Sequence, residues 1–315
     1  MRVSRTHQES HTPSAEVTLL ESGDTVTENA VMAAIATRQD CVQIQNASCN
    51  YMVQDLCFFL RAMVEVSIQG IGTPLLTIRC NGSPPSPWLV LFSILEDPIE
   101  SFFFVSAAVV TKSNLLIERV PISFLRLELR LLQKMGLEVR EGPNYTAGNG
   151  VTPLCDLKVL AKDSSLAAVK LRLRPNVYPF GINVDNLPAF GPIAAVAHGS
   201  SLLHDWMYET RASYCASLAE FGVDVELRDA HQVHTLGPAR FKPAPCHLPP
   251  ALRPASMLLL ASLAAAGESR LSNIEVLSRG YEDLCSRLRS IGAQIDVCEP
   301  GRDSKARAET IRSVI

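Results

Sequence analysis

The sequence predicts an α/β fold built from repeated units of βαβαββ type, and two observations support this class. A segment of amphipathic helix, turn and short strand occurs four times, and its turn positions are Val64, Gly136, Gly222 and Gly292. The copies recur at about 70 to 86 residues, a spacing that suits one such unit. Each copy also follows a helix of small apolar residues and a second strand, and this alternation indicates helices laid on sheets.

The first copy covers the N-terminal part of the chain. Its first helix is expected in the apolar segment that begins at Ala30, and its second helix in the segment that begins at Val53. Apolar residues of the second helix recur at helical spacing and therefore share one face: Val53, Leu56, Cys57, Leu60 and Met63. Val64 stands at the turn where the other copies have glycine, so we expect a different helix end there.

The other three copies repeat this pattern. Their first helices are expected in apolar segments that begin at Phe104, Gly191 and Ala255. Their second helices end at Gly136, Gly222 and Gly292, where a residue with positive φ commonly terminates a helix and glycine adopts it at little cost. In the fourth copy the predicted apolar face consists of Tyr281, Leu284, Cys285, Leu288 and Ile291.

The repeats predict the domain organisation. Residues 1–15 are polar and aperiodic and are expected to form a disordered tail. One βαβαββ unit is predicted for residues 16–90 as the remnant of a first domain, and three units for residues 91–300 as a second domain. Residues 301–315 are expected to form a polar tail. A length of 315 residues is sufficient for two domains.

Composition excludes several classes of function. The chain is 47% hydrophobic and 19% charged with a net charge of −3, and it has no run of Lys or Arg, so nucleic acid is not an expected partner. No apolar stretch is long enough to span a bilayer, and the N-terminus has no apolar signal core. We therefore predict a cytoplasmic protein without a membrane partner.

The cysteine and histidine residues do not predict a metal site or another cofactor. Cys57, Cys215 and Cys285 occupy the same helix position in three copies, which indicates small core residues. No CxxC pair occurs among the nine cysteines. The histidines lack zinc-ligand spacing and are expected to be solvated loop residues: His231, His234 and His247.

Charged residues at predicted helix starts are the candidates for chemistry. Arg211, Arg253 and Arg279 each begin a predicted helix, where the positive end of the helix dipole disfavours a cation. An anion bound there would explain all three positions, because a guanidinium and a helix N-terminus together suit phosphate or carboxylate. Two alternatives remain at this point: Asp185 serves only as an N-cap, and the arginines are only solvated.

Six segments, in order, resemble the enolpyruvyl transferase family, and they cover most of the chain. They include GDTVTENAVMAAIA from Gly23, DPIESFFFVSAAVV from Asp97, YPFGINVDNLPAF from Tyr178, YETRASYCASLAEFG from Tyr208, LRPASMLLLASLAAAGES from Leu252 and RGYEDLCSRLRSIG from Arg279. The first of these is similar to the family's third βαβαββ unit. The RGYE and DPIE segments favour the branch of the family that uses a nucleotide-sugar acceptor.

The resemblance implies an inside-out α/β barrel of repeated units, four of six being present, with transfer of the enolpyruvyl group of phosphoenolpyruvate to an acceptor hydroxyl. Asp185 matches the carboxylate that serves as base. Arg211, Arg253 and Arg279 match the arginines that bind phosphoenolpyruvate. The positions that match acceptor contacts are Ser22, Gly23 and Met207.

The chain also differs from the family pattern. The first lysine is Lys112, Leu19 stands where a lysine is usual, and Ala251 and Ser278 replace acidic residues. Three hypotheses remain open. The chain transfers the enolpyruvyl group to UDP-N-acetylglucosamine or another uridine nucleotide; it binds an anionic metabolite or a partner without catalysis; or it belongs to the shikimate-phosphate branch.

Overall fold

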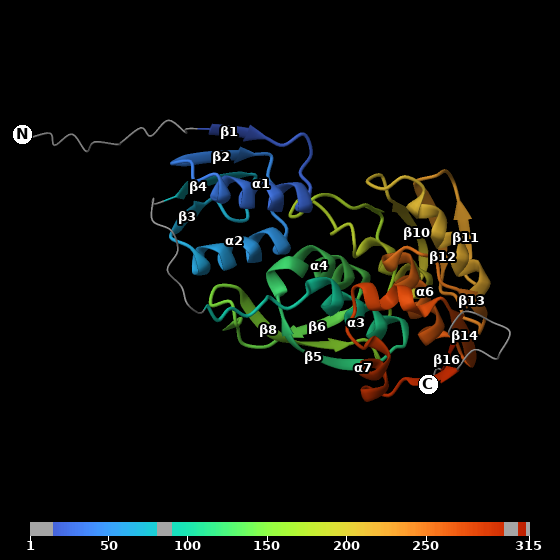
Figure 1. Ribbon diagram of the computed structural model, residues 1–315. Helices are drawn as coiled ribbons and strands as arrows, with labels where there is room; N and C mark the ends of the chain where they lie inside the picture. The colour runs from blue at the N-terminus through green and yellow to red at the C-terminus, as the bar shows by residue number, and fades with distance from the viewer. Residues whose placement is uncertain (1–14, 81–89, 299–307, 313–315) are drawn as a thin grey trace, which may run out of the picture. The chain divides into compact units, whose positions relative to one another are not determined.

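The computed structural model describes residues 15–80, 90–298 and 308–312, which divide into two compact units (Figure 1). The first unit extends to Ile94 and includes Gly148–Val151, and the second comprises Leu95–Ala147 and the chain from Thr152 onward. The predicted boundary between residues 90 and 91 lies a few residues before this division. Each unit has its own hydrophobic core.

The first unit contains one complete βαβαββ arrangement. Its elements are β1 (Ala15–Thr18), α1 (Asp24–Ala36), β2 (Cys41–Gln45), α2 (Tyr51–Met63), β3 (Val66–Gln69) and β4 (Leu75–Cys80). The sheet has the order β1-β2-β4-β3, in which β1 runs parallel to β2 and the other pairs are antiparallel. On α2, Val53, Cys57 and Leu60 are buried, as the predicted apolar face requires.

The second unit contains three sheets, and two of them repeat the strand order of the first unit. The chain forms α3 (Pro98–Val110), β5 (Asn114–Val120), η1 (Ile122–Leu125), α4 (Arg126–Met135), β6 (Glu138–Glu141), β7 (Tyr145–Thr146) and β8 (Pro153–Leu160). It continues with β9 (Arg172–Leu173), η2 (Leu187–Ala189), α5 (Phe190–Val196), β10 (Gly199–His204), η3 (Arg211–Phe221), β11 (Asp224–Leu227) and β12 (Gln232–Gly237). The last group is β13 (Pro245–His247), α6 (Leu252–Ala264), β14 (Glu268–Ser272), η4 (Ile274–Arg279), α7 (Leu284–Ser290), β15 (Gln294–Cys298) and β16 (Ala308–Arg312).

The strand orders of these sheets show the internal repetition. The orders β9-β10-β12-β11 and β13-β14-β16-β15 match the first unit in both neighbours and directions. The sheet β5-β8-β6 has the equivalents of the second, fourth and third strands. Residues 90–97, the described residues directly before α3, contain no strand equivalent to the first. The same backbone arrangement therefore recurs along the chain.

The helices of small apolar residues form the interior of the second unit. Helices α3, α5 and α6 contact one another, and twelve of the thirteen residues of α3 are buried. The Phe102 and Phe190 rings pack with centroids 5.3 Å apart at the junction of α3 and α5. Because these helices have no polar face, they are buried all round, and the sheets lie outside them. This is the inside-out arrangement that the family resemblance implies.

The predicted helix ends are confirmed. Gly136, Gly222 and Gly292 have φ values of 109°, 78° and 109°. At Gly136 space adds a second constraint, because a Cβ there would lie 2.7 Å from the Ser165 carbonyl oxygen. Val64 instead ends α2 in an extended conformation with φ −133°.

Three expectations about local structure are wrong. The segment from Arg211 to Phe221 forms a 3₁₀ helix rather than an α-helix, and its buried residues occur at every third position: Ala212, Cys215, Leu218 and Phe221. That spacing matches the three residues per turn of a 3₁₀ helix. Ile291 follows the end of α7 and is 48% exposed, so it is not part of the buried face.

The third wrong expectation concerns the polar tail predicted for residues 301–315. Ala308–Arg312 forms β16, which lies between β14 and β15 in the sheet. A strand of five mostly polar residues has too little apolar alternation to be recognised from sequence. The remaining positions of the two predicted tails, residues 1–14, 301–307 and 313–315, lie outside the described residues.

Cys57 is a core residue, and its substitution tests the predicted structural role of the cysteines. It is fully buried on α2, and burial raises its pKa to about 12, so the thiol stays protonated at neutral pH. We expect Cys57→Ala to lower the free energy of unfolding by about 1 to 3 kcal/mol through lost packing, measured by chemical denaturation. Cys285 is only half-buried, and Cys285→Ala should cost less. If either variant lost the ability to bind a ligand while its stability stayed the same, the cysteine would not be a packing residue.

Candidate active site

Asp185 lies in a tight loop, residues 183–186, that leads into η2. The Asn183 side-chain oxygen accepts a hydrogen bond from the Asp185 backbone N–H at 3.0 Å, and the Asn183 carbonyl accepts one from the Asn186 N–H at 2.9 Å. Asn186 directly precedes η2, and the Asp185 side chain does not cap it. The N-cap alternative for Asp185 is therefore wrong. Its carboxylate is 31% exposed.

Arg253 approaches the Asp185 carboxylate from the start of α6. Its Nη2 lies 3.3 Å from Asp185 Oδ2, and its Nη1 lies 3.3 Å from the Tyr281 hydroxyl. Burial acts to lower the pKa of Arg253, but Asp185 and Tyr281, with smaller contributions from other groups, raise it overall. The guanidinium therefore stays charged. Both contacts are long for charged hydrogen bonds, which leaves Arg253 able to shift toward an incoming anion.

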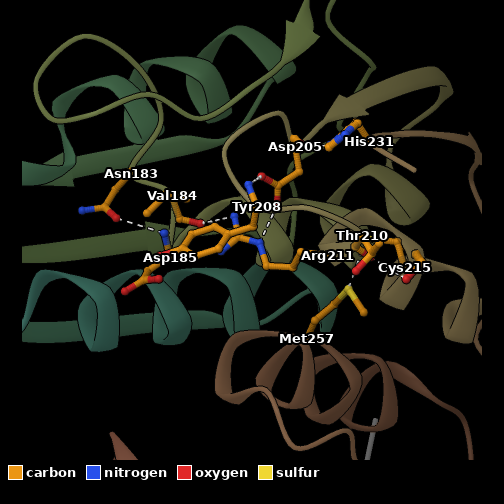
Figure 2. Close-up of polar contacts among 11 residues, drawn as sticks. Asn183, Val184, Asp185, Asp205, Tyr208, Thr210, Arg211, Cys215, His231 and Met257 are labelled. Carbon is orange, nitrogen blue, oxygen red and sulfur yellow. Dashed lines mark hydrogen bonds and ion pairs between the residues drawn. The ribbon is translucent and has the colours of Figure 1, made fainter. Parts of the chain in front are cut away.

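Arg211, the first residue of η3, is held by three groups of the protein (Figure 2). Its Nε pairs with the Asp205 carboxylate, and its Nη2 donates to the Val184 carbonyl oxygen at 2.9 Å. The Tyr208 ring lies against the guanidinium, 4.4 Å from centroid to Cζ. The Arg211 and Asp205 side chains are only 10% and 5% exposed. Arg211 therefore anchors the backbone beside Asp185, and only its Nη1 has no hydrogen bond to a described residue.

Arg279 occupies a different position from the one predicted. It is the last residue of η4, and four residues separate it from the start of α7 at Leu284. It is exposed, and its Nη1 donates to the Pro250 carbonyl oxygen at 2.9 Å, two residues before α6. The following Gly280 allows a close approach, because a Cβ there would lie 2.5 Å from Leu252 Cδ2. Arg279 thus lies beside the start of α6, near Arg253.

Arg279 is the arginine of the site that is available to an anion. Arg211 and Arg253 form ion pairs with Asp205 and Asp185, and Asp97 and Glu128 are further acidic groups near the site. Arg279 is exposed and forms no ion pair with a described residue, so a carboxylate or phosphate is able to contact it. The half-exposed Asp185 carboxylate is able to accept a proton from a bound hydroxyl group.

The predicted acceptor-binding residues lie in both units. Ser22 and Gly23 belong to the first unit, where Gly23 precedes α1 and the Ser22 hydroxyl donates to the Ala47 carbonyl at 3.3 Å. Met207 belongs to the second unit and is half-buried two residues after Asp205. The structure thus brings together Asp185 with Arg211 and Arg253, and places Arg279 near Arg253.

Sequence reasoning missed several polar residues of this site: Glu128, Asn183, Asp205, Tyr208 and Tyr281. Glu128 carried a usable signal, because it occupies a position on the apolar face of α4, whose other members include Leu129, Leu132 and Met135. Asp205 carried none, because a single aspartate directly after β10 belongs to no local pattern that indicates a buried ion pair. His231 was expected to be solvated, but it is half-buried, and its Nδ1 lies 2.8 Å from the Asp205 carbonyl oxygen.

Neither a metal site nor a membrane span occurs in the part of the chain that the structure describes. No group of three His, Cys, Asp or Glu side chains there is arranged to hold a metal ion. No helix among the same residues is long and apolar enough to cross a bilayer.

Sequence comparison identifies relatives over most of the chain. The family model of EPSP synthase (3-phosphoshikimate 1-carboxyvinyltransferase) matches residues 7–288. The UDP-N-acetylglucosamine 1-carboxyvinyltransferase of Dichelobacter nodosus is 32% identical over 272 residues, which are 86% of this chain and 60% of that protein. The enzyme of the same name from Bradyrhizobium diazoefficiens is 31% identical over 282 residues, 89% of this chain and 62% of that protein. The chain thus spans about three fifths of the length of these relatives.

Solved structures show the same fold. The enolpyruvyl transferase NikO from Streptomyces tendae superposes with a TM-score of 0.73 at 22% identity, covering 95% of this chain and 66% of that chain. EPSP synthase from Acinetobacter baumannii gives a TM-score of 0.68 at 18% identity, covering 86% of this chain and 61% of that chain.

Proposed function

Because the chain belongs to the EPSP synthase family of enolpyruvyl (1-carboxyvinyl) transferases, we propose that it transfers the enolpyruvyl group of phosphoenolpyruvate to a nucleotide-type acceptor. The acceptor hydroxyl would belong to UDP-N-acetylglucosamine or another uridine nucleotide, and phosphate would be released. The names of the sequence relatives support this acceptor class. The observation that carries the proposal is the position of the partly exposed Asp185 carboxylate 3.3 Å from Arg253.

Asp185 is the proposed general base. Its carboxylate takes the proton of the acceptor hydroxyl as that oxygen bonds to C2 of phosphoenolpyruvate, while C3 gains a proton from solvent. The resulting tetrahedral intermediate then loses phosphate from C2 and returns a proton from C3 to solvent, which restores the double bond; the proton on Asp185 leaves with the phosphate. Arg253 contacts the Asp185 carboxylate at 3.3 Å and so helps to orient the base.

The arginines are the proposed binding groups for phosphoenolpyruvate. Arg253 and Arg279 lie at and beside the start of α6, where guanidinium groups suit the carboxylate and phosphate of the substrate. Arg211 contributes its Nη1 edge, because its other contacts hold Asp205 and Val184. Ser22, Gly23 and Met207 are the proposed acceptor contacts.

A second candidate is binding of an anionic metabolite without turnover. The positions of Arg253 and Arg279 support this alternative as well, because they suit a bound anion and do not require turnover. Such a protein would keep the arginine pocket and bind phosphoenolpyruvate or phosphate.

Phosphate release from phosphoenolpyruvate distinguishes these candidates. The assay compares UDP-N-acetylglucosamine, simple uridine nucleotides and shikimate 3-phosphate as acceptors. Release that depends on a uridine nucleotide supports the proposal, and release only with shikimate 3-phosphate assigns the chain to that branch. If no acceptor gives release but phosphoenolpyruvate binds, the chain is a binding protein.

Binding itself is predicted to stabilise the fold. Phosphoenolpyruvate at a hundredfold excess over its dissociation constant should raise the free energy of unfolding by about 2.7 kcal/mol, seen as a higher melting temperature. Arg279→Ala should weaken that binding by about 10- to 100-fold, because a charge-assisted hydrogen bond is lost. The matched control is Arg270→Ala on β14, whose side chain is 74% exposed. An unchanged melting temperature together with no binding heat in calorimetry would exclude an intact anion pocket.

A further inference from the structure

We propose that Glu128 is a positioning residue that holds the Asp185 loop in its working conformation. The inference rests on the function proposed for Asp185, and it adds a residue from a different repeat of the second unit. Glu128 lies on α4, far from Asp185 in the sequence, and does not contact the Asp185 side chain in any described hydrogen bond or ion pair.

The contacts of Glu128 bracket Asp185 on both sides. Its Oε1 accepts a hydrogen bond from the Asn183 backbone N–H at 2.8 Å and another from Asn186 Nδ2 at 3.1 Å. The two loop residues between these contacts, Val184 and Asp185, are thereby restrained at both ends. Because the Asn183 side chain in turn accepts the Asp185 N–H, the restraint extends to the backbone of Asp185 itself.

Glu128 also sets the orientation of the Asn186 amide. Asn186 is 1% exposed, and its Oδ1 has no hydrogen-bond partner among the described residues. Rotating the amide by half a turn would place that oxygen against the Glu128 carboxylate, with two acceptors facing each other. The carboxylate therefore favours the orientation in which Nδ2 faces it.

The burial of Glu128 is difficult to explain as packing. The residue is 2% exposed, and no lysine or arginine of the described chain forms an ion pair with it. Burial raises its pKa, and the hydrogen bonds from Asn183 and Asn186 partly offset that rise. An unpaired buried carboxyl group costs stability, whereas leucine would suit the apolar face of α4. The hydrogen bonds to the loop are the evident reason for a carboxylate at this position.

The loop is held from three repeats of the second unit. Glu128 comes from the repeat that contains α4, Arg211 donates to the Val184 carbonyl from the next repeat, and Arg253 contacts the Asp185 carboxylate from the last. Of these, Glu128 acts only on the backbone and on Asn186, so its role is to place Asp185 rather than to bind substrate.

Two variants of Glu128 test the proposal by amide hydrogen exchange. Glu128→Leu removes the acceptor, and we expect the Asn183 amide to exchange about tenfold faster or more, with little change in α3 and α6. Glu128→Gln keeps an oxygen acceptor and should leave exchange within about threefold of the unmodified chain. Unchanged exchange at Asn183 in Glu128→Leu would overturn the proposal.

Turnover provides the second readout. Misplacement of the base should lower kcat of Glu128→Leu by about 10- to 100-fold with little change in KM for phosphoenolpyruvate, and Glu128→Gln should restore most of the rate. Equal loss of kcat in both variants would show that the charge matters rather than the hydrogen bonds, and would also overturn the proposal. If the unmodified chain has no activity, the proposed function fails, and the exchange result alone decides the role of Glu128.

A third variant covers the case in which Glu128→Leu does not fold. Asn186→Ala leaves the sequence of α4 unchanged and removes the hydrogen bond from Asn186 Nδ2 to Glu128, one of the two contacts between Glu128 and the loop. We expect the backbone amides of residues 183–186 to exchange faster than in the unmodified chain. The increase should be smaller than in Glu128→Leu, which loses both contacts. Exchange equal to that of the unmodified chain would contradict the positioning role.

Discussion

Asp185→Asn is expected to lower turnover by about 10²- to 10⁴-fold while leaving the affinity for phosphoenolpyruvate nearly unchanged. The amide has the shape of the carboxylate and keeps an oxygen that Arg253 is able to contact, as Asp185 Oδ2 does at 3.3 Å. It cannot take the acceptor proton at neutral pH. The effect should therefore appear in kcat, measured as phosphate release at saturating substrates, and not in calorimetric binding of phosphoenolpyruvate.

Asp163→Asn is a suitable control for Asp185→Asn, because it makes the same chemical change at an exposed position of the second unit. It should leave kcat unchanged. Phosphate release that persisted at the original rate in Asp185→Asn would show that another group acts as the base.

Asp205→Ala is expected to lower the free energy of unfolding by about 3 to 5 kcal/mol. The ion pair between Asp205 and Arg211 is nearly fully buried, with side chains 5% and 10% exposed. Removing the carboxylate leaves the Arg211 charge without its acidic partner, and the cost of burying that charge is not recovered. Urea denaturation followed by circular dichroism measures the change.

Two controls separate burial from charge pairing in general. Glu141→Gln breaks the ion pair between Glu141 and Arg126, whose contact is 2.6 Å but whose side chains are 34% and 55% exposed. This variant should lower the free energy of unfolding by less than about 1 kcal/mol. The double variant Asp205→Leu with Arg211→Met removes both charges and should recover much of the stability lost in Asp205→Ala. If Asp205→Ala lowered the free energy of unfolding as little as Glu141→Gln does, the buried pair would not be important for stability.

The features predicted correctly from sequence depend on local periodicity and backbone conformation. The glycines at 136, 222 and 292 have the positive φ values expected of helix ends. The apolar segments that became α3 and α6 are buried all round, as their composition indicates. Both signals depend only on neighbours in the chain, so a single sequence contains them.

The features that were missed depend on partners distant in sequence. Arg279 carries a charge near a predicted helix start, but its actual contact is the Pro250 carbonyl oxygen. The importance of Asp205 comes from Arg211 and a buried environment that no local pattern reports. Glu128 was visible as a charge on an apolar face, yet its partners Asn183 and Asn186 lie more than fifty residues away.

The convergence of three repeats on one loop has a consequence for the nascent chain. Glu128 leaves the ribosome first, the 183–186 loop and Arg211 follow, and Arg253 comes last. Until α6 has emerged and docked, the Asp185 carboxylate lacks its contact with Arg253, and the proposed anion pocket is incomplete. The proposed ligand site thus forms only in molecules whose second unit is fully synthesised and assembled.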